Sequence, residues 1–361
     1  MLGLEGLGRH SKPFAPQTRS FNFNMTLDFL HAVVGGRSLT ETEAESAMCA
    51  LLAGESTPVL TAAFLTALRM KGETVEELTG FARAMRAAST PLPIDPSVRP
   101  LLDTCGTGGG GKGTFNISTV TAIVVAGAGM SVAKHGNRSI SSQCGSADLL
   151  EALGVRTHVT PEVAAAAIRD AGIGVLFAPA FHSAMKHVQP VRLELKMRTA
   201  FNYLGPLSNP ARAEIQVTGT WSDDAAEKIA GALARLGLER GYVIHGSDGL
   251  GELTVTGPAL VFDVRTGEVR RMTLAPEDFG LPRHPFEDLL GGDAERNRAI
   301  AESVLAGEPG APRDIVLMNV SLALVAAGKA EDWKSGVALA AQSIDSGAAS
   351  AKLAALRRAM A

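Results

Sequence analysis

The chain has 361 residues, a formal net charge of -3 and a hydrophobic fraction of 46%. This length exceeds that of a typical single domain, so we expect two lobes, or one large domain with a smaller one attached. The slightly negative charge provides no global attraction for nucleic acid or for an anionic membrane. We therefore predict a small-molecule ligand, with any phosphate bound locally by a few Lys, Arg and backbone N–H groups.

The three cysteines, Cys49, Cys105 and Cys144, have spacings that fit neither a disulfide framework nor a zinc site. We predict reduced thiols and a cytoplasmic location. No apolar run approaches the roughly 20 residues that a membrane span requires. Residues 1–24 lack the apolar core of a secretory signal, so we expect a flexible tail, with Met25 as an alternative start site.

Residues 25–88 carry apolar side chains at three- and four-residue steps, the spacing of helices. Two helix-start signals lie within them, Thr40 followed by Glu43 and Thr74 followed by Glu77. In each pair the hydroxyl caps the first turn and the carboxylate reaches back to the backbone. We predict a small all-α N-terminal unit.

The motif Thr90-Pro91-Leu92-Pro93 predicts an extended linker, because proline disfavours helix in the residue before it. Beyond Pro100, short apolar runs alternate with helical stretches, which is typical of α/β folds with a mainly parallel sheet. The expected strands are 101–103, 131–134, 175–178, 215–220 and 242–245, with an antiparallel edge hairpin of 260–264 and 269–274. The expected helices are 161–171, 224–236, 294–306, 315–327 and 333–346.

The strongest chemical signal is the glycine-rich segment 103–119, DTCGTGGGGKGTFNIST, which follows a predicted strand and opens a helix. Glycines let backbone N–H groups approach an anion closely, and the helix N-terminus adds a favourable dipole. Asn116, Ser118 and Thr119 cap the helix and offer oxygens to a phosphate or its magnesium. The segment matches neither the Walker pattern nor the dinucleotide fingerprint. A structural hinge is the alternative, and we predict a phosphate-binding loop.

A second polar group, Lys134-His135-Gly136-Asn137-Arg138, comes directly after a predicted strand and is followed by SSQCGS at 141–146. Ligands of open α/β sheets gather at the carboxyl ends of strands, so these residues are expected to face the same crevice as the glycine loop. Two cations, an imidazole and hydroxyls suit a phosphate and a carboxylate together. The alternative is a solvated basic turn.

Two further clusters lie later in the chain. Within the segment 182–210, Arg198 has the planar guanidinium that contacts a carboxylate in a bidentate manner, although basic residues on helices are often merely solvated. The segment His245-Gly-Ser-Asp-Gly-Leu-Gly-Glu-Leu253 follows another strand and carries acids suited to a hard cation, with an ordinary surface turn as the alternative.

These blocks, in this order, resemble the anthranilate phosphoribosyltransferase family of tryptophan biosynthesis. The similarity runs from Leu27 to the C-terminal helix and includes Asn319, Gly-Gly-Asp at 291–293 and SIDSG at 343–347. The resemblance implies a nucleoside phosphorylase/phosphoribosyltransferase-like fold. Its small helical domain would comprise 25–90 with about 186–212, and its α/β domain 91–185 with 213–361. It also implies phosphoribosyl diphosphate and anthranilate as substrates, Mg²⁺ as cofactor, and a homodimer through the helical domain, with neither nucleic acid nor membrane as partner.

The resemblance also implies roles for individual residues. Those matching phosphoribosyl diphosphate contacts are Gly106, Thr107, Gly108, Gly109, Thr114, Asn116, Ser118, Thr119, Lys134 and Ser146. Those matching the anthranilate pocket are Gly108, His135, Asn137, Arg198, Gly205 and Pro206. Ser118 and Glu252 match magnesium positions. No residue is expected to act as a covalent or acid/base catalyst, because the reaction requires charge stabilisation and positioning.

Two positions depart from the family pattern. Gly110 stands where the family loop usually has Asp, and Gly251-Glu252 replaces the family's Asp-Glu metal pair. Either metal affinity is weakened, or another acid such as Asp248 compensates, or the acceptor has diverged. Two rivals also remain: a nucleic-acid-binding relative, and a nucleoside phosphorylase, whose Lys and Ser ahead of the loop are replaced here by Thr104 and Cys105.

Overall fold

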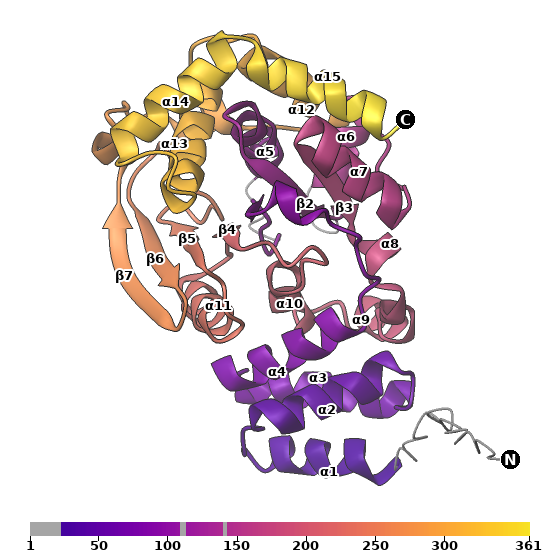
Figure 1. The fold of residues 1–361 in the computed structure, drawn as a ribbon. Helices are drawn as coiled ribbons and strands as arrows, with labels where there is room; N and C mark the ends of the chain where they lie inside the picture. The colour runs from indigo at the N-terminus through magenta and orange to yellow at the C-terminus, as the bar shows by residue number, and fades with distance from the viewer. Residues whose placement is uncertain (1–22, 109–112, 140–142) are drawn as a thin grey trace, which may run out of the picture.

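The computed structural model describes residues 23–108, 113–139 and 143–361. Figure 1 shows the N-terminal helices as a separate layer below a larger part that contains the whole sheet. The N-terminal layer consists of α1 (Phe23–Val34), α2 (Glu41–Leu52), α3 (Pro58–Lys71) and α4 (Val75–Ala87). Of the expected tail, residues 1–22 lie outside the described residues, and Phe23 and Asn24 already belong to α1.

The two capping boxes expected in this layer are confirmed. Thr40 and Thr74 accept from the backbone N–H groups of Glu43 and Glu77, whose carboxylates bond back to the backbone N–H groups of the two threonines. Glu77 is completely buried and also accepts from Leu39 N at 2.9 Å and from the Lys71 ammonium at 2.9 Å. One carboxylate therefore joins the start of α4 to the loop before α2 and to the end of α3.

The larger part is built on one seven-stranded sheet of order β3-β2-β1-β4-β5-β6-β7. Adjacent strands from β3 through β5 pair in parallel, whereas β6 and β7 form the antiparallel edge hairpin that the sequence predicted. The bounds are β1 (Leu101–Asp103), β2 (Ser131–Gly136), β3 (Ile173–Phe177), β4 (Ile215–Gly219), β5 (Arg240–Gly246), β6 (Ala259–Arg265) and β7 (Glu268–Leu274). The carboxyl ends of β1, β2, β4 and β5 thus lie at one edge.

Helices cover both faces of the sheet (Figure 1). One face packs against α5 (Ile117–Gly127), α13 (Ala311–Ala326), α14 (Trp333–Asp345) and α15 (Ala348–Ala359), and the other packs against α11 (Asp223–Arg235). Successive residues of β5 alternate between the two cores, because side chains along a strand point to opposite faces. Tyr242 and Ile244 join the first core, and Val243 joins the second.

The remaining helices are short or lie at the periphery. They are α6 (Ser146–Ala152), α7 (Pro161–Ala171), α8 (Ala178–Phe181), α9 (Gln189–Leu195), α10 (Phe201–Leu207) and α12 (Ala294–Leu305). The single-turn 3₁₀ segments are Pro96–Val98, Ser183–His187, Pro276–Phe279 and Phe286–Leu289. In the described part of the chain, no helix is long and apolar enough to cross a bilayer.

The segment 188–207 returns to the N-terminal layer. Val188, Phe201, Leu204 and Leu207 are buried in the same core as α2, α3 and α4. This packing supports the division into 25–90 with about 186–212 and 91–185 with 213–361, which we propose as the domain boundaries. The core also includes α11, so the two domains share an apolar contact.

The expected strands and helices are present, with shifted ends. Strand β1 and helix α7 have the predicted bounds, whereas α13 begins at Ala311 rather than residue 315. The earlier start places Pro312 in the first turn, where its missing N–H costs no helical hydrogen bond. Ala178, expected to end a strand, instead begins α8.

Glu77→Ala should lower the free energy of unfolding by about 3 kcal/mol, because it leaves the poorly exposed Lys71 ammonium and two backbone N–H groups without their acceptor. Urea unfolding monitored by circular dichroism measures the change. Glu76→Ala is the matched control, since its ion pair with Arg235 is exposed and should contribute at most about 1 kcal/mol. Equal losses in both variants would contradict this role of Glu77.

Candidate active site

The glycine-rich loop leaves the carboxyl end of β1 and lies against the end of β4. Thr107 N donates to Gly219 O at 2.9 Å, and the Thr107 hydroxyl donates to the same carbonyl at 3.2 Å. Gly108 has a φ of +65°, a conformation that favours glycine. Gly109 and Gly110 lie outside the described residues. The described part of the loop, Gly106–Gly108, is therefore fixed by main-chain contact with β4.

The helix after the loop begins as the sequence predicted. Asn116 is the N-cap of α5, and its side-chain oxygen accepts from Thr119 N at 3.1 Å. Asn116 N donates to the Asn297 side chain of α12 at 2.8 Å, and Thr114 pairs with Leu290 in an isolated bridge. Thr119 is completely buried, so it faces the core while Ser118, one residue before it, lines a cavity at the sheet edge.

Lys134 places a buried ammonium group at the start of α5. Its Nζ lies 3.3 Å from both Thr104 O and Thr104 Oγ1, and 3.5 Å from Ser118 Oγ. Burial lowers the pKa of Lys134, and the nearby Asp103 carboxylate opposes this shift. The sequence-predicted Lys134 and Ser118 are thus brought together beside the loop, where positive charge favours an anionic ligand.

Glu252 comes from the loop after β5 and lines the same cavity as Thr104, Gly106 and Ser118. Burial raises the pKa of Glu252 to about 7, against the opposing effect of Lys134. Asn319 of α13, buried in the core, clamps the adjacent Leu253 by accepting from its N–H at 3.1 Å and donating to its carbonyl at 3.0 Å. A carboxylate and a hydroxyl at one cavity are ligands suited to Mg²⁺.

Asp248 accepts hydrogen bonds within its own loop and is not placed as a second metal ligand. Its carboxylate accepts from Thr254 Oγ1 at 2.5 Å, from Thr256 Oγ1 at 2.8 Å and from Leu250 N at 3.0 Å. These three donors hold the loop that carries Glu252. The acid that sequence reasoning offered as a substitute for the missing carboxylate at Gly251 is therefore engaged within its own loop.

Gly219 is a residue that sequence reasoning missed. A Cβ at Gly219 would lie 1.8 Å from Gly251 O, and a Cβ at Gly106 would lie 3.3 Å from Gly219 O. The main chains of the glycine loop, the end of β4 and the Glu252 loop therefore stack without room for a side chain at Gly219. The signal in the sequence was a glycine near the end of the strand predicted at 215–220, because glycine in a strand often marks the close approach of another backbone.

His135 and the segment Gly205-Pro206 form the second half of the site. His135 Nδ1 lies 3.1 Å from Gly205 O, and its ring meets His182 edge-on with centroids 5.2 Å apart. Burial lowers the pKa of His135 to about 3, and that of His182 to about 4. Because a carbonyl only accepts, Nδ1 of the neutral His135 carries the proton and donates it. Within the described residues, Nε2 of neither imidazole has a hydrogen-bond partner.

Gln216 of β4 holds the other carbonyl of this segment. Its Nε2 donates to Pro206 O at 2.7 Å and to Thr218 Oγ1 at 2.8 Å. The segment predicted to orient the acceptor is therefore fastened to the sheet at two successive carbonyls. Sequence reasoning found Gly205 and Pro206 and included His182 in the cluster 182–210 without a role. It missed Gln216, because no local pattern places residues of distant segments beside one another.

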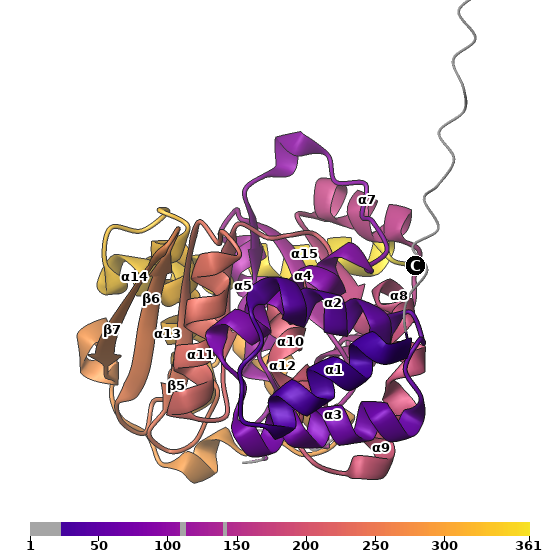
Figure 2. The ribbon, with the colours of Figure 1, turned by 90° about the horizontal axis from the view of Figure 1, so that it is seen from below.

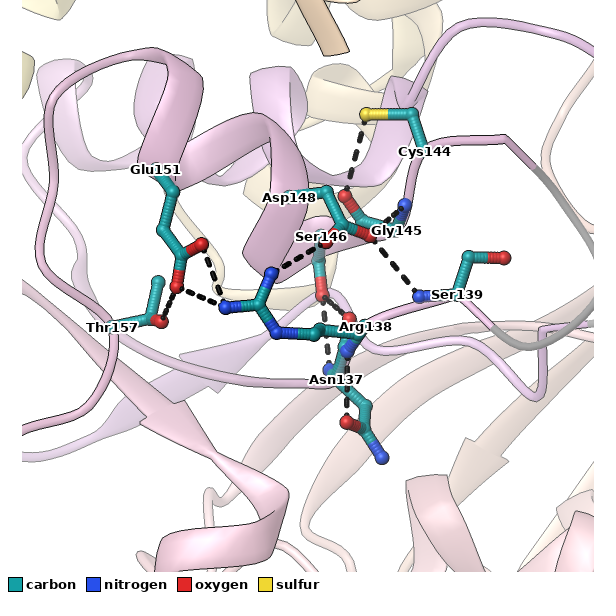
Figure 3. Close-up of polar contacts among 9 residues, drawn as sticks. All are labelled: Asn137, Arg138, Ser139, Cys144, Gly145, Ser146, Asp148, Glu151 and Thr157. Atoms are coloured by element: carbon teal, nitrogen blue, oxygen red, sulfur yellow. Dashed lines mark hydrogen bonds and ion pairs between the residues drawn. The ribbon is translucent and has the colours of Figure 1, made fainter. Parts of the chain in front are cut away.

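Asn137 and Ser146 meet where β2 ends and α6 begins (Figure 3). Ser146 Oγ accepts from Asn137 N at 3.1 Å and donates to Asn137 O at 3.1 Å. The expected second cation, Arg138, is instead paired with Asp148 and Glu151, at 2.9 and 2.8 Å. Arg138 therefore braces α6, and the expectation of two cations for the ligand is wrong in this structure, since carboxylates neutralise Arg138.

Arg198 precedes the acceptor-site candidates Gly205 and Pro206 in the chain and stacks on an aromatic ring. Its Cζ lies 5.0 Å from the ring centroid of Trp221, which follows β4, and Trp221 meets Tyr203 of α10 edge-on at 4.7 Å. The stack places the exposed guanidinium near the junction of β4 with α10. The contact is a cation–π interaction, for which arginine is well suited.

A helical layer, a mainly parallel sheet and a glycine loop beside a buried ammonium and a carboxylate define a transferase of activated sugars. The whole-chain comparisons agree with this class. Residues 98–350 match the a/b domain of the glycosyl transferase family, and residues 27–89 match the helical bundle domain of that family.

Comparison with relatives identifies a family within this class of transferases. The chain is 60% identical to the anthranilate phosphoribosyltransferase of Solibacter usitatus over 91% of its own length and 97% of the relative, and 54% identical to that of Moorella thermoacetica over 90% and 95%. The chain therefore belongs to the anthranilate phosphoribosyltransferase family.

Solved structures show the same fold. The Thermus thermophilus enzyme superposes with a TM-score of 0.87 at 46% identity, covering 92% of this chain and 99% of that one. The Saccharomyces cerevisiae enzyme, solved in complex with phosphoribosyl diphosphate (PRPP) and Mg, superposes with a TM-score of 0.85 at 28% identity, covering 93% and 98%. Another structure of the yeast enzyme contains 4-fluoroanthranilate.

Gly219→Ala should lower kcat/KM for the sugar-diphosphate donor about 100-fold, because its Cβ forces apart the glycine loop and the Glu252 loop. Steady-state kinetics at saturating acceptor measure this effect. Gly35→Ala is the control, since its Cβ would meet His31 O at 3.3 Å and Ala32 O at 3.4 Å, both in the N-terminal layer. Wild-type donor kinetics in Gly219→Ala would show that this backbone contact does not position the site.

Proposed function

We propose that this chain transfers the phosphoribosyl group of PRPP to anthranilate, giving N-(5-phosphoribosyl)anthranilate and diphosphate for tryptophan biosynthesis. The observation that carries the proposal is the glycine loop at the start of α5, with Lys134, Ser118 and Glu252 gathered beside it. Membership of the family supports the choice of substrates.

The donor half of the site favours departure of diphosphate. The bond between the ribose anomeric carbon and the diphosphate oxygen breaks, leaving positive charge on the sugar and negative charge on the leaving group. Because Thr107 N donates to Gly219 O, we assign the backbone N–H groups of Gly106 and Gly108 and the start of α5 to that negative charge, and the Lys134 ammonium adds to their field. We assign Thr114, Asn116 and Thr119 to shaping this helix start, and Gly109 to the loop by family resemblance.

The magnesium proposal rests on the donor set of the cavity. Glu252 and Ser118 are hard oxygen ligands, and Mg²⁺ is commonly held by one or two carboxylates together with substrate phosphates. When bound, the ion would neutralise the diphosphate as it leaves. Gly251 removes one carboxylate from the family pair, and the cavity retains the single carboxylate that this mode of binding requires.

The acceptor half of the site positions the amine of anthranilate. Because His135 is neutral and donates through Nδ1 to Gly205 O, its unprotonated Nε2 can accept an N–H of the amine. Asn137, anchored by Ser146, and the Gly205-Pro206 segment complete the wall, and we assign the anthranilate carboxylate to Arg198. The amine nitrogen then bonds to the anomeric carbon as the bond to diphosphate breaks, and its extra proton passes to water, with no covalent enzyme intermediate.

We also propose a homodimer through the N-terminal layer. Six of the eight exposed large apolar side chains in the described residues belong to α1, α3, α9 or the residues just after α9: Leu27, Val34, Val59, Met70, Leu193 and Met197. Figure 2 shows α1, α3 and α9 side by side on one face. Exposed apolar clusters of this kind mark protein interfaces.

For location we propose the cytoplasm. All three cysteines lie in the described part of the chain and are thiols rather than disulfides. Reduced cysteines are typical of that compartment. Fractionation of cells that produce the chain, with immunodetection, tests the location.

Incubating the chain with anthranilate, PRPP and increasing Mg²⁺ should produce a loss of anthranilate fluorescence that requires all three components. The experiment tests acceptor, donor and metal together. Fluorescence that stays constant at every Mg²⁺ concentration would exclude this function and favour a diverged acceptor.

Arg198→Ala should raise the KM for anthranilate about 10- to 100-fold, the loss expected for a charge-assisted bidentate contact, with far less effect on the KM for PRPP. Arg192→Ala is the matched control, because Arg192 also stacks on an aromatic ring, 5.2 Å from the centroid of Phe201. Equal losses for both substrates would refute the assignment of Arg198.

Val59→Glu should convert the dimer to a monomer, because it places a charge on the apolar surface at a side chain that is 78% exposed, while leaving the protomer core intact. Size-exclusion chromatography with light scattering measures the mass. Val269→Glu, on edge strand β7, should leave the dimer unchanged. A dimer that survives Val59→Glu would place the interface elsewhere.

A further inference from the structure

We infer that Asp103 and Asn209 are positioning residues that tie the sugar-diphosphate loop to the segment that orients the acceptor. Asp103 is the last residue of β1, at the start of the glycine-rich segment, and Asn209 follows α10, three residues after Pro206 of the acceptor segment. The roles of the two segments, binding the donor and orienting the acceptor, rest on the proposed function. The link between the segments rests on the geometry alone.

The link is a buried hydrogen bond between residues 106 positions apart in the chain, in which Asn209 Nδ2 donates to Asp103 Oδ2 at 2.7 Å. The same amide donates to Ala133 O of β2 at 2.9 Å, while its oxygen accepts from Ala211 N at 2.8 Å. Both side chains are buried. Every polar atom of the Asn209 side chain thus has a partner, which fixes its orientation.

The second oxygen of Asp103 reaches the acceptor side by another path. Asp103 Oδ1 accepts from His135 N at 3.2 Å, and the ring of the same histidine donates to Gly205 O. One carboxylate therefore contacts the acceptor segment directly through Asn209 and indirectly through His135. On the donor side Asp103 continues into Thr104, whose hydroxyl donates to Ser118 O at 2.9 Å and contacts Lys134 Nζ.

The acceptor segment is also held from the helical domain. Arg86 of α4 donates through Nε to Leu207 O at 2.7 Å, and burial lowers the pKa of Arg86 to about 10. Hydrogen bonds from two sides consequently hold the segment 205–209. Arg86 of α4 contacts it from the helical domain, and Gln216, His135 and Asp103 contact it from the sheet. The Asp103–Asn209 bond is the one of these contacts that ends directly on the strand leading into the donor loop.

The hydrogen bonds and charges around Asp103 favour a positioning role for this carboxylate over the binding of a metal ion. Ligand atoms of Asp103, Cys105 and His135 lie within 4.8 Å of one another, a spacing that suits a small cation. Both Asp103 oxygens, however, already accept hydrogen bonds, and the Lys134 ammonium faces the same carboxylate. A carboxylate that accepts from two N–H donors and lies near a buried ammonium already has its charge compensated within the protein, and these donors fix its position.

Asn209→Ala removes the amide donor, so the buried Oδ2 of Asp103 loses its hydrogen bond from residue 209. Because loop and acceptor segment then move independently, the KM values for PRPP and for anthranilate should both rise, and kcat/KM should fall about 10- to 100-fold for each. This pattern differs from that of Arg198→Ala, in which only the acceptor is affected. A purely structural role would reduce the active fraction, lowering kcat while leaving both KM values unchanged.

Asn209→Asp provides a second, chemical readout. It places two carboxyl groups in contact, and one shared proton restores a hydrogen bond between them at low pH. The groups that face this pair are Lys134 and His135 of β2 and Cys105 of the loop. Activity relative to wild type should rise severalfold from pH 8.5 to pH 6 in Asn209→Asp, and should stay flat in Asn209→Ala.

The matched control is Asn202→Asp, the same chemical change on α10. Asn202 only accepts, from Thr199 N at 2.9 Å, so a carboxylate replaces its function. It should show neither the joint loss for both substrates nor the pH-dependent recovery. If Asn202→Asp reproduces the behaviour of Asn209→Asp, or if Asn209→Asp shows no recovery at pH 6, the inferred link is overturned.

Hydrogen–deuterium exchange separates this inference from the proposed function, since it needs no turnover. In Asn209→Ala, amides of residues 103–108 and 201–209 should exchange faster together, while those of α2 remain at the wild-type rate. Faster exchange confined to 201–209 would refute the link even if the chain transfers phosphoribosyl groups. Joint acceleration in a chain without that activity would support the link and refute the proposed function.

Discussion

The site depends on one close main-chain contact at the carboxyl ends of β1, β4 and β5. Gly219 leaves no space for a Cβ against Gly251 O, and its carbonyl receives both donors of Thr107. This contact sets the distance between the loop that we propose to bind diphosphate and the loop that carries Glu252. Backbone atoms alone make this contact, so it needs no side chains at these positions. The space that side chains would fill is left for the proposed anionic substrate.

Electrostatics then divides the site into two halves of different character. The donor half collects a buried ammonium, a helix N-terminus and a carboxylate around one cavity, which suits an anion held with a divalent cation. The acceptor half contains His135 and His182, which burial keeps uncharged near neutral pH. A neutral imidazole can accept a hydrogen bond from an aromatic amine, so we propose that His135 faces the uncharged amine of the acceptor, while Arg198 binds its carboxylate.

The segment 186–212 joins these halves to the helical layer. Leu204 and Leu207 anchor it in the core of α2, α3 and α4, and its carbonyls bond to side chains of the sheet. The segment thus belongs to both domains, and a movement of one domain against the other would be transmitted to the acceptor wall. Family resemblance indicated its place, but the sequence pattern contained no signal for Gln216, which holds Pro206 from β4.

The sequence by itself determined the local features. Glycine-rich composition predicted the anion loop, capping boxes predicted two helix starts, and apolar periodicity predicted the strands, because each depends on residues within one turn or one strand. Only the tertiary structure decided that Arg138 pairs with Asp148 and that Asp103 meets Asn209. The first contact joins the loop after β2 to α6, and the second joins the end of β1 to the residues after α10. Because both contacts join separate elements, the packing of those elements selects the partners, and no pattern within one helix or strand contains them.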